Sequence, residues 1–176
     1  EIEAGRERYN AVLWKDLAGV DLLGVGLPAA VGGSEHGFLE LAVILSEVGW
    51  SVAPVPAYAA LVLGADPIAR YGTAAQQARY LPGIVAGTSV LSAGWMEPGR
   101  PDPSAPATAA RRDGECWRID GTKELVPAAQ LADAIVVPAT TEDGDVGLFI
   151  VETTGPGVQI TAGATTNAEP HAGIVL

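Results

Sequence analysis

The hydrophobic pattern of this chain changes its period near residue 88, and this change limits the folds that the chain can adopt. Before residue 88, apolar residues recur three or four positions apart, which is the spacing of amphipathic helices. After it, short apolar runs rich in β-branched residues alternate with turn-forming clusters. Helices followed by closely spaced strands indicate an α+β chain. We therefore expect a helical domain over residues 1–88 and a β domain over residues 89–176.

Helical segments are expected throughout the first half. Their approximate bounds are residues 13–20, 38–48, 57–63, 66–72 and 73–87. We expect Ser34 and Asp66 to act as N-caps, because such side chains accept hydrogen bonds from the free N–H groups of a first helical turn. Thr73 and Gln76 have the spacing of a capping box. Pro82 is expected to bend or shorten the helix that they begin.

Two other features of the first half are interpreted as structural. Gly24–Ala29 reads GVGLPA and matches a dinucleotide-binding fingerprint, but a helix precedes it and Pro28 breaks the helix that the fingerprint requires after it. We therefore expect a tight connection between helices at this point. Trp14 and Trp50 are expected to fill the core, as large aromatic side chains usually do.

Short strands are expected in the second half. Their approximate bounds are residues 89–96, 115–119, 134–138, 146–151 and 158–161. The stretch Ile119–Asp133 also begins like a strand after a turn, but it carries Pro127, which has no N–H for a strand ladder or a ligand. The Pro-rich segment Gly99–Pro106 is expected to be an exposed loop.

The charge and composition exclude several classes of function. A net charge of −11 argues against electrostatic binding to nucleic acid or to an anionic membrane surface. No apolar run approaches the roughly 20 residues of a transmembrane helix. The single Cys116 excludes an internal disulfide, which suits the cytoplasm, and one cysteine with two histidines makes no zinc site. The chain has no initiator Met and stops on the apolar run Gly173–Leu176, so we expect it to be part of a longer polypeptide.

Five segments, in this order, carry a resemblance to a known family. They are Leu13–Gly33, Arg70–Thr88 (RYGTAAQQARYLPGIVAGT), Met96–Pro98 (MEP), Trp117–Lys123 (WRIDGTK) and Ala132–Asp133. Together they resemble the acyl-CoA dehydrogenase family, in which the third segment reads T-E-P and the fourth closes on G-x-K. The resemblance covers nearly the whole chain, and the second segment is its most specific part.

The resemblance implies a helical N-terminal domain followed by a β-barrel-like middle domain that is truncated at its C-terminal end. Members of the family bind FAD and oxidise the Cα–Cβ bond of an acyl-CoA thioester. A carboxylate base removes the α-proton, the flavin accepts the β-hydride, and the electrons pass to an electron-transfer flavoprotein. Most members place that base beyond the position of Leu176, so the resemblance nominates no catalytic residue in this chain.

The resemblance also implies which residues contact the flavin. The family holds the isoalloxazine ring between the T-E-P segment and a W-I-T run, and the matching positions are Trp95, Met96, Leu125, Val126 and Pro127. Met96 replaces the first Thr, and Leu125 and Pro127 replace the Trp and Thr of the run. Each lost neutral hydrogen bond costs about 0.5–1.5 kcal/mol, so the family's flavin contacts are weakened or reorganised here. The backbone N–H groups of Met96 and Val126 are the donors expected to remain.

Two questions stay open at this point, the role of Arg100 and the function of the chain as a whole. Arg100 stands near the family's phosphate-binding serine, and it is interpreted either as a phosphate ligand or as a solvated loop residue. The chain as a whole is interpreted as part of a catalytic acyl-CoA dehydrogenase-like subunit in a homo- or hetero-oligomer. The alternatives are a non-catalytic partner subunit with a degenerate flavin site, as in some actinobacterial heteromers, and an unrelated α+β binding module.

Overall fold

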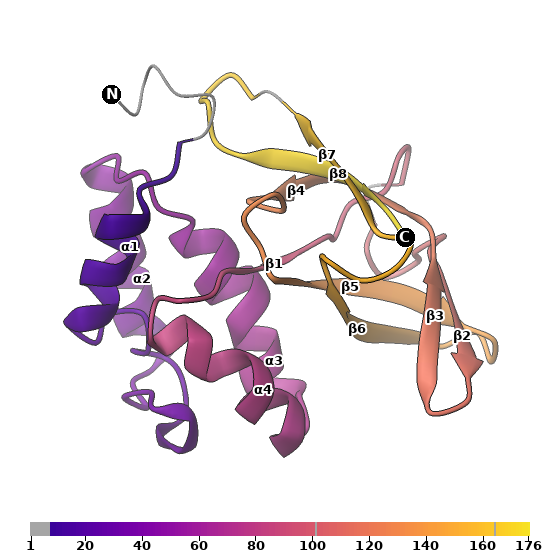
Figure 1. Cartoon of the computed structure of the whole chain (residues 1–176), viewed down its shortest axis with the longest axis horizontal. Coiled ribbons are helices and arrows are strands. Elements are labelled where there is room, and N and C mark those ends of the chain that lie inside the picture. Colours follow the sequence, from indigo (N-terminus) through magenta and orange to yellow (C-terminus); the bar gives the residue numbers. More distant parts are fainter. Residues whose placement is uncertain (1–7, 101, 164) are drawn as a thin grey trace. The chain divides into compact units, whose positions relative to one another are not determined.

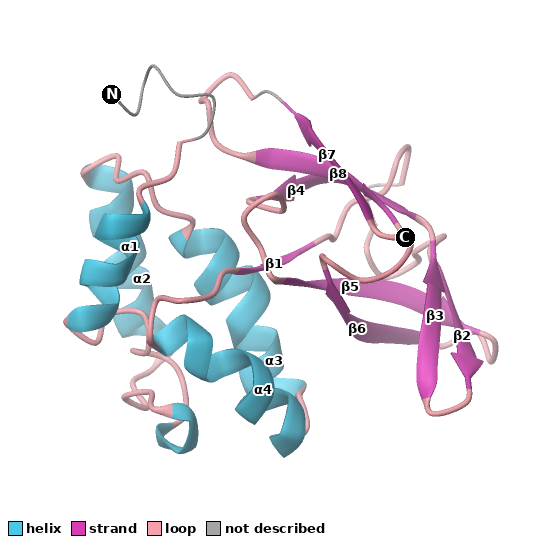
Figure 2. Cartoon of the chain, in the orientation of Figure 1, coloured by secondary structure: helices cyan, strands magenta, loops and turns pink. Residues whose placement is uncertain are grey.

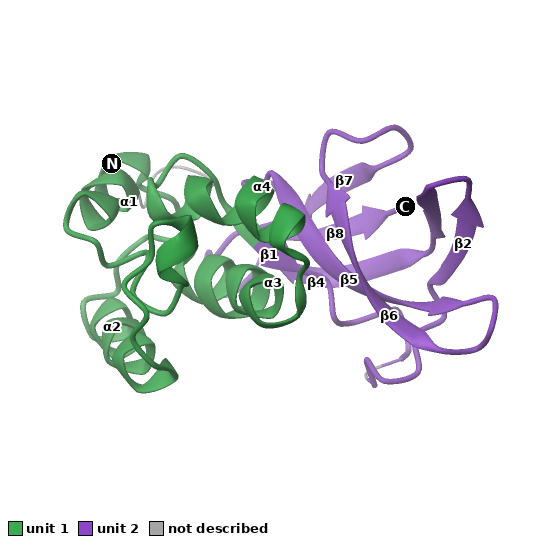
Figure 3. Ribbon diagram, turned by 90° about the horizontal axis from the view of Figure 1, so that it is seen from below, with its two compact units in different colours: residues 1–91 green, residues 92–176 purple. Residues whose placement is uncertain are grey.

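The computed structural model describes residues 8–100, 102–163 and 165–176 (Figure 1). The chain divides into two compact units, Glu1–Leu91 and Ser92–Leu176, which are coloured separately in Figure 3. Figure 2 shows helices in the first unit and strands in the second. The chain is thus an α+β protein in which helices precede sheets, as the change of hydrophobic period predicts.

The first unit contains helices joined by short turns. Its helical elements are α1 (Ala11–Gly19), η1 (Ala29–Val31), α2 (Phe38–Trp50), η2 (Tyr58–Ala65), α3 (Asp66–Tyr71) and α4 (Ala74–Val85). Asn10 caps α1, because its side-chain oxygen accepts from the N–H of Leu13 at 3.0 Å. The expected capping box at α4 is confirmed: Gln76 N–H donates to the Thr73 hydroxyl at 3.3 Å, and Thr73 N–H donates to Oε1 of Gln76 at 2.8 Å.

Two expectations about helix N-caps are wrong. Ser34 does not cap α2; Gly37 occupies the N-cap position, and its N–H donates to the Glu40 carboxylate at 2.8 Å. Asp66 is not an N-cap either, because the π-helical turns of η2 run directly into α3 with helical backbone at Ala65. Pro82, which was expected to bend or shorten this helix, lies inside α4, and the helix ends at Val85.

One of the two tryptophans expected in the core is there. Trp14 is buried, and its indole N–H donates to the backbone C=O of Ser89 at 3.4 Å. Trp50 is 89% exposed, so its assignment to the core is wrong. Trp50 is the last residue of α2, and it lies away from the helix face that buries Leu41. A hydrophobic period alone does not tell a buried aromatic residue from one at an exposed helix end.

The second unit consists of two sheets. One is ordered β1-β5-β2-β3 with β6 also paired to β5, and the other is ordered β4-β8-β7. The strands are β1 (Leu91–Ala93), β2 (Ala109–Asp113), β3 (Cys116–Asp120), β4 (Thr122–Pro127), β5 (Ala134–Thr141), β6 (Val146–Glu152), β7 (Gln159–Gly163) and β8 (His171–Val175). The pairs β2–β3, β4–β8, β5–β6 and β7–β8 are antiparallel, whereas β2 and β5 pair in parallel at Ala109 and Ala110.

Two points distinguish this β unit from the sequence-based expectation. Over the described residues the two sheets do not close into a barrel. The five predicted strands are present with shifted ends, and β4 lies in the stretch that was expected to begin like a strand, but β2 and β8 were not predicted. β2 reads AARRD and has no β-branched residue, and β8 reads HAGIV, with β-branched residues only at its last two positions, so neither has the alternating pattern from which strands are recognised.

Candidate functional site

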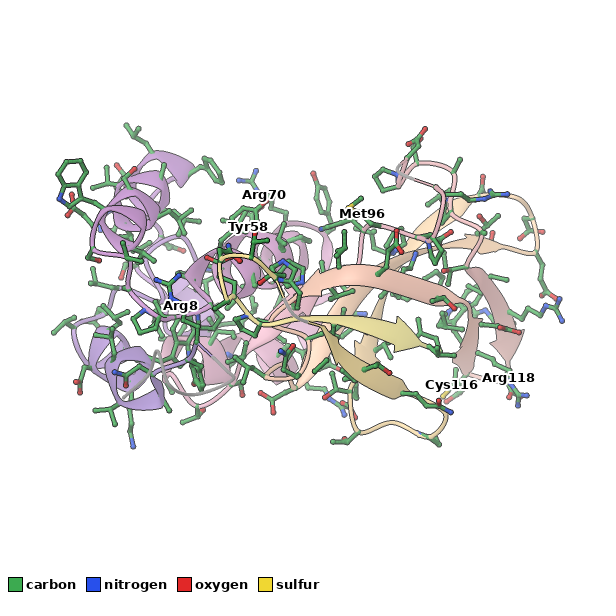
Figure 4. All side chains as sticks on the ribbon, turned by 90° about the horizontal axis from the view of Figure 1, so that it is seen from above. Arg8, Tyr58, Arg70, Met96, Cys116 and Arg118 are labelled. Atoms are coloured by element: carbon green, nitrogen blue, oxygen red, sulfur yellow. The ribbon has the colours of Figure 1, made fainter. Side chains whose placement is uncertain are left out.

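The structure brings together the two segments that the sequence singled out. Met96, which follows β1, forms an isolated antiparallel bridge with Glu124 of β4, and the N–H of Glu124 donates to the C=O of Met96 at 3.0 Å. Figure 4 labels the Met96 side chain. Two segments well separated in the sequence therefore lie side by side, within one compact unit.

The segment 92–97 follows β4 at more than this one point. The Ser92 hydroxyl donates a short hydrogen bond to the C=O of Pro127, and Ser92 is fully buried. On its other side, Gly94 N–H donates to the C=O of Val136 in β5 at 2.9 Å. The segment thus connects the two sheets. Gly94 permits this close approach, because a Cβ there would lie 3.0 Å from Cγ of Lys123.

A β-bulge in β4 turns Leu125 toward the solvent. Lys123 pairs with Ile174 and Val126 pairs with Ala172, so two residues of β4 stand opposite the single Gly173. Leu125 adopts a φ of 51°, which is unfavourable for a residue with a Cβ. Its side chain is 56% exposed and that of Met96 is 40% exposed. The bridge and the bulge therefore present two apolar side chains from adjacent segments.

The other three predicted flavin residues are less exposed. Val126 is only 1% exposed, so its side chain belongs to the core and only its backbone is available to a ligand. Trp95 and Pro127 are both half-buried. Among these five positions, Met96 and Leu125 alone present large apolar groups to the surface.

The position of Pro127 in the ladder explains why a proline is tolerated there. Pro127 is paired with His171, and the next residue, Ala128, donates its N–H to the C=O of Pro170 at 2.6 Å. Hydrogen-bonded and non-hydrogen-bonded pairs alternate in an antiparallel ladder, so the pair Pro127–His171 requires no N–H from the proline. The strand loses no bond to β8. What is missing is a donor on the opposite edge of β4, the edge that faces Ser92.

An ion pair lies beneath this surface. Nζ of Lys123 is 2.7 Å from Oε1 of Glu97, and it also donates to the C=O of Pro138 at 2.8 Å. Lys123 is 0% exposed and Glu97 is 4% exposed. Glu97 also accepts from Ala107 N–H at 2.6 Å, from Thr108 N–H at 3.0 Å and from the Thr108 hydroxyl at 2.6 Å. Both carboxylate oxygens are thus satisfied, as a buried charge requires.

The surroundings of the pair shift both pKa values. Burial by itself raises the pKa of Glu97, but hydrogen bonds from Lys123, from the Thr108 hydroxyl and from two backbone N–H groups outweigh it and lower that pKa to about 2. Burial lowers the pKa of Lys123, and the bond to Glu97 opposes that shift. The carboxylate is therefore ionised at neutral pH and holds four hydrogen bonds, which makes it a poor candidate for a catalytic base.

Arg100 lies on the turn that follows Glu97. The backbone N–H of Arg100 donates to the C=O of Glu97 at 3.0 Å, and Gly99 adopts a φ of 68° between them. The Arg100 side chain is exposed. Further along, Asp102 accepts from the N–H and hydroxyl of Ser104 at 2.9 and 2.6 Å, and these bonds lower the Asp102 pKa. The described part of the segment is an exposed loop, as predicted, apart from Pro106, which is buried.

The described part of the chain lacks both a metal-binding cluster and a membrane-spanning helix. Its His, Cys, Asp and Glu side chains form no group of three or more that is able to hold a metal ion. None of its helices has the length and apolar character needed to cross a bilayer.

Comparison with known protein families gives a match for each half of the chain. Residues 1–88 match the acyl-CoA dehydrogenase N-terminal domain, and residues 95–174 match the acyl-CoA dehydrogenase middle domain. The chain belongs to the acyl-CoA dehydrogenase family. FAD-dependent dehydrogenation of acyl-CoA thioesters is the general role of that family. The Met96 bridge and the β4 bulge both lie in the part that matches the middle domain.

The acyl-CoA dehydrogenase FadE27 of Mycobacterium tuberculosis is 33% identical over 169 residues, which cover 94% of this chain and 43% of FadE27. Similar solved structures are the Tcur3481-Tcur3483 steroid ACAD G363A variant (41% identity, TM-score 0.93) and the ChsE4-ChsE5 complex of Mycobacterium tuberculosis (29%, 0.90). A third is a glutaryl-CoA dehydrogenase of Mycobacterium smegmatis in complex with FADH2 (29%, 0.83). The chain covers 48%, 47% and 45% of these three, so it spans about half of each.

The ion pair of Glu97 and Lys123 is the part of the site that the sequence analysis did not assign. Both residues lie in segments that carried the family resemblance, MEP and WRIDGTK. The available signals were Glu97 between the apolar residues Met96 and Pro98, and Lys123 as one of only two lysines in the chain. Nothing in the sequence indicated that the two residues would meet.

Proposed function

We propose that this chain forms one wall of the FAD site in an acyl-CoA dehydrogenase-like subunit that oxidises an acyl-CoA thioester to its α,β-unsaturated product. The observation that carries the proposal is the pairing of Met96 with the bulged β4, which exposes Met96 and Leu125 together. Electron transfer from the subunit to an electron-transfer flavoprotein belongs to the same proposal.

The residues present fit a flavin as a nonpolar wall. Met96 and Leu125 offer a soft thioether and a branched alkyl group, which pack against the flat face of a heteroaromatic ring. They provide no side-chain donor, and Pro127 provides neither a hydroxyl nor an N–H. Binding by this wall therefore depends on apolar contact, on backbone groups near Met96 and Val126, and on residues from elsewhere in the complete protein.

The roles of the residues in this chain are binding and orientation. FAD, when bound, supplies the hydride acceptor at N5 of its ring. Met96 and Leu125 exclude water from one side of the ring and restrict its tilt. Glu97 directly follows Met96, but its carboxylate is held by Lys123 and is not proposed as the base. We propose no catalytic residue in this chain. Arg100 is proposed as a phosphate ligand for FAD or acyl-CoA, because its side chain is exposed on a turn.

A second candidate function is that of a non-catalytic partner subunit in a heteromeric acyl-CoA dehydrogenase. The absence of hydroxyl groups at Met96 and Pro127, where the family has threonines, favours it. A similar solved structure is the ChsE4-ChsE5 complex, which contains two differently named subunits. In this alternative the wall stabilises the assembly, and the flavin is bound by the partner.

The visible absorption of the purified complete protein distinguishes these candidates. The protein is expressed alone and together with the product of a neighbouring acyl-CoA dehydrogenase gene, and bound FAD is quantified per subunit. One FAD per subunit in the protein alone supports the leading proposal, and FAD only in the pair supports the second. A colourless protein in both preparations contradicts both.

A domain boundary between residues 88 and 89, an oligomeric state and a cytoplasmic location belong to the same proposal.

A further inference from the structure

The buried ion pair joins the two segments that carry Met96 and Leu125, the residues of the proposed FAD wall. Glu97 directly follows Met96, and Lys123 lies two residues before Leu125. The segment 92–97 and β4 run antiparallel with three contacts in order: Ser92 to Pro127, Met96 to Glu124 and Glu97 to Lys123. The ion pair is the last of these contacts, and it alone among the three joins two charged side chains.

The β-bulge depends on fixed anchors on either side. Lys123 is held by Glu97 and by the C=O of Pro138, and Val126 is held in the core. Glu124 and Leu125 between them share the single partner residue Gly173. A non-glycine residue at positive φ persists only where its surroundings enforce it. If Lys123 moved along the ladder by one residue, the side chains of β4 would exchange faces and Leu125 would leave the surface.

Stability alone does not account for this ion pair. Apolar residues of similar volume often replace a buried pair with no loss of stability. An ion pair differs from apolar packing in that it specifies one arrangement of its two segments, since any other would leave a buried charge unpaired. Glu97 also fixes the residues just before β2, because its carboxylate accepts hydrogen bonds from the N–H groups of Ala107 and Thr108.

We propose that Glu97 and Lys123 are positioning residues that set the register between the segment 92–97 and β4, and thereby hold Met96 and Leu125 in the arrangement that contacts FAD. This inference rests on the proposed function for the identity of the ligand. Neither residue touches the ligand itself, because both side chains are buried.

The test compares three variants of the complete protein with a matched control. E97Q/K123M removes both charges and keeps similar side-chain volumes, E97D withdraws the carboxylate by one methylene, and G94A crowds Lys123 without altering either charge. The control, D113N/R118M, removes an exposed ion pair of 3.1 Å in the same unit. The measurements are hydrogen exchange of the peptide 122–127 without added flavin, the FAD dissociation constant, the visible band of bound flavin, and the melting temperature.

We expect each of the three variants to accelerate exchange of 122–127 and to weaken FAD binding by at least tenfold. The band of the remaining bound flavin should shift, independently of the melting temperature, and the control should stay within twofold of the wild type. A folded variant with wild-type exchange, FAD affinity and flavin band overturns the inference. If E97Q/K123M does not fold, G94A decides by the same criteria. Faster exchange in a protein whose wild type binds no FAD contradicts the proposed function but supports the positioning role.

Discussion

The Ser92 hydroxyl and the Pro127 carbonyl are joined by a hydrogen bond between the strand that opens the β unit and the end of β4. The bond lies on the edge of β4 where Pro127 has no N–H to offer. The carbonyl of the proline thus provides the link between segments that its nitrogen cannot. This contact, the Met96 bridge and the ion pair of Glu97 with Lys123 together determine how the proposed FAD wall is built.

Ser92→Ala should destabilise the protein by about 1–3 kcal/mol, because it leaves the Pro127 carbonyl without its buried donor. Urea unfolding monitored by circular dichroism measures the change. Ser46→Ala is the matched control: its hydroxyl bonds to the C=O of Ala42 at 2.9 Å on an exposed helix surface. We expect a change within about 0.5 kcal/mol there. Equal losses in the two variants would show that the Ser92 bond has no special role.

Lys123→Met should lower the free energy of unfolding by about 3–5 kcal/mol, since it leaves the Glu97 carboxylate buried without its cation. Adding Glu97→Gln should recover much of that loss, because the second change removes the unpaired charge. The two single variants and the double variant form a mutant cycle measured by urea unfolding. Arg70→Met, which removes an exposed ion pair of 2.7 Å on α3, should leave the melting temperature unchanged. Additive losses at Glu97 and Lys123 would contradict the coupling.

The free energy of unfolding should decrease at acidic pH, over a range that the pKa of Glu97 determines. Its pKa is about 2 in the folded protein, against an ordinary value of 4.5, so the folded state favours the ionised form. The resulting stabilisation is complete above about pH 4.5 and is lost as the pH falls toward 2, on the order of 3 kcal/mol in total. Urea midpoints between pH 2 and pH 7 measure it. Glu97→Gln should be less sensitive to pH over this range, and an unchanged pH profile in that variant would contradict the assignment.

Pro127→Thr should be tolerated, because the proline makes no ladder bond to β8 that a threonine would disturb. We expect a change in unfolding free energy within about 1 kcal/mol. The new hydroxyl should strengthen FAD binding by about 0.5–1.5 kcal/mol, the net value of one neutral hydrogen bond. Pro127→Ala removes the ring without adding a hydroxyl and should not strengthen binding. Equal affinities in these two variants would show that the hydroxyl is not directed at the flavin.

The order of elements was predictable from sequence because it follows from local chemistry. The capping box of Thr73 and Gln76 and the helical spacing before residue 88 depend on neighbours within one turn, and both are observed. The strands β2 and β8 were not predictable, because β2 consists of Ala, Arg and Asp, β8 begins with His, Ala and Gly, and each also depends on a pairing partner distant in the sequence. Trp50 was misassigned because its exposure depends on tertiary packing.

In the candidate site, too, the features set by local sequence were predictable and those set by distant pairing were not. The positions of Met96, Leu125 and Pro127 were read from short segments of sequence. The bulge that exposes Leu125 requires the register of β4 against β8, and the partnership of Glu97 with Lys123 spans 26 residues. Both are consequences of long-range pairing, which no local pattern encodes.

The most direct test of the central claim is the fluorescence of Leu125→Trp during titration of the complete protein with FAD, compared with Leu148→Trp on the exposed part of β6. If the wall of Met96 and Leu125 contacts the ring, the tryptophan introduced at position 125 should be quenched in proportion to FAD bound, and the one at position 148 should not. Saturable binding of FAD with equal quenching in both variants would contradict the claim.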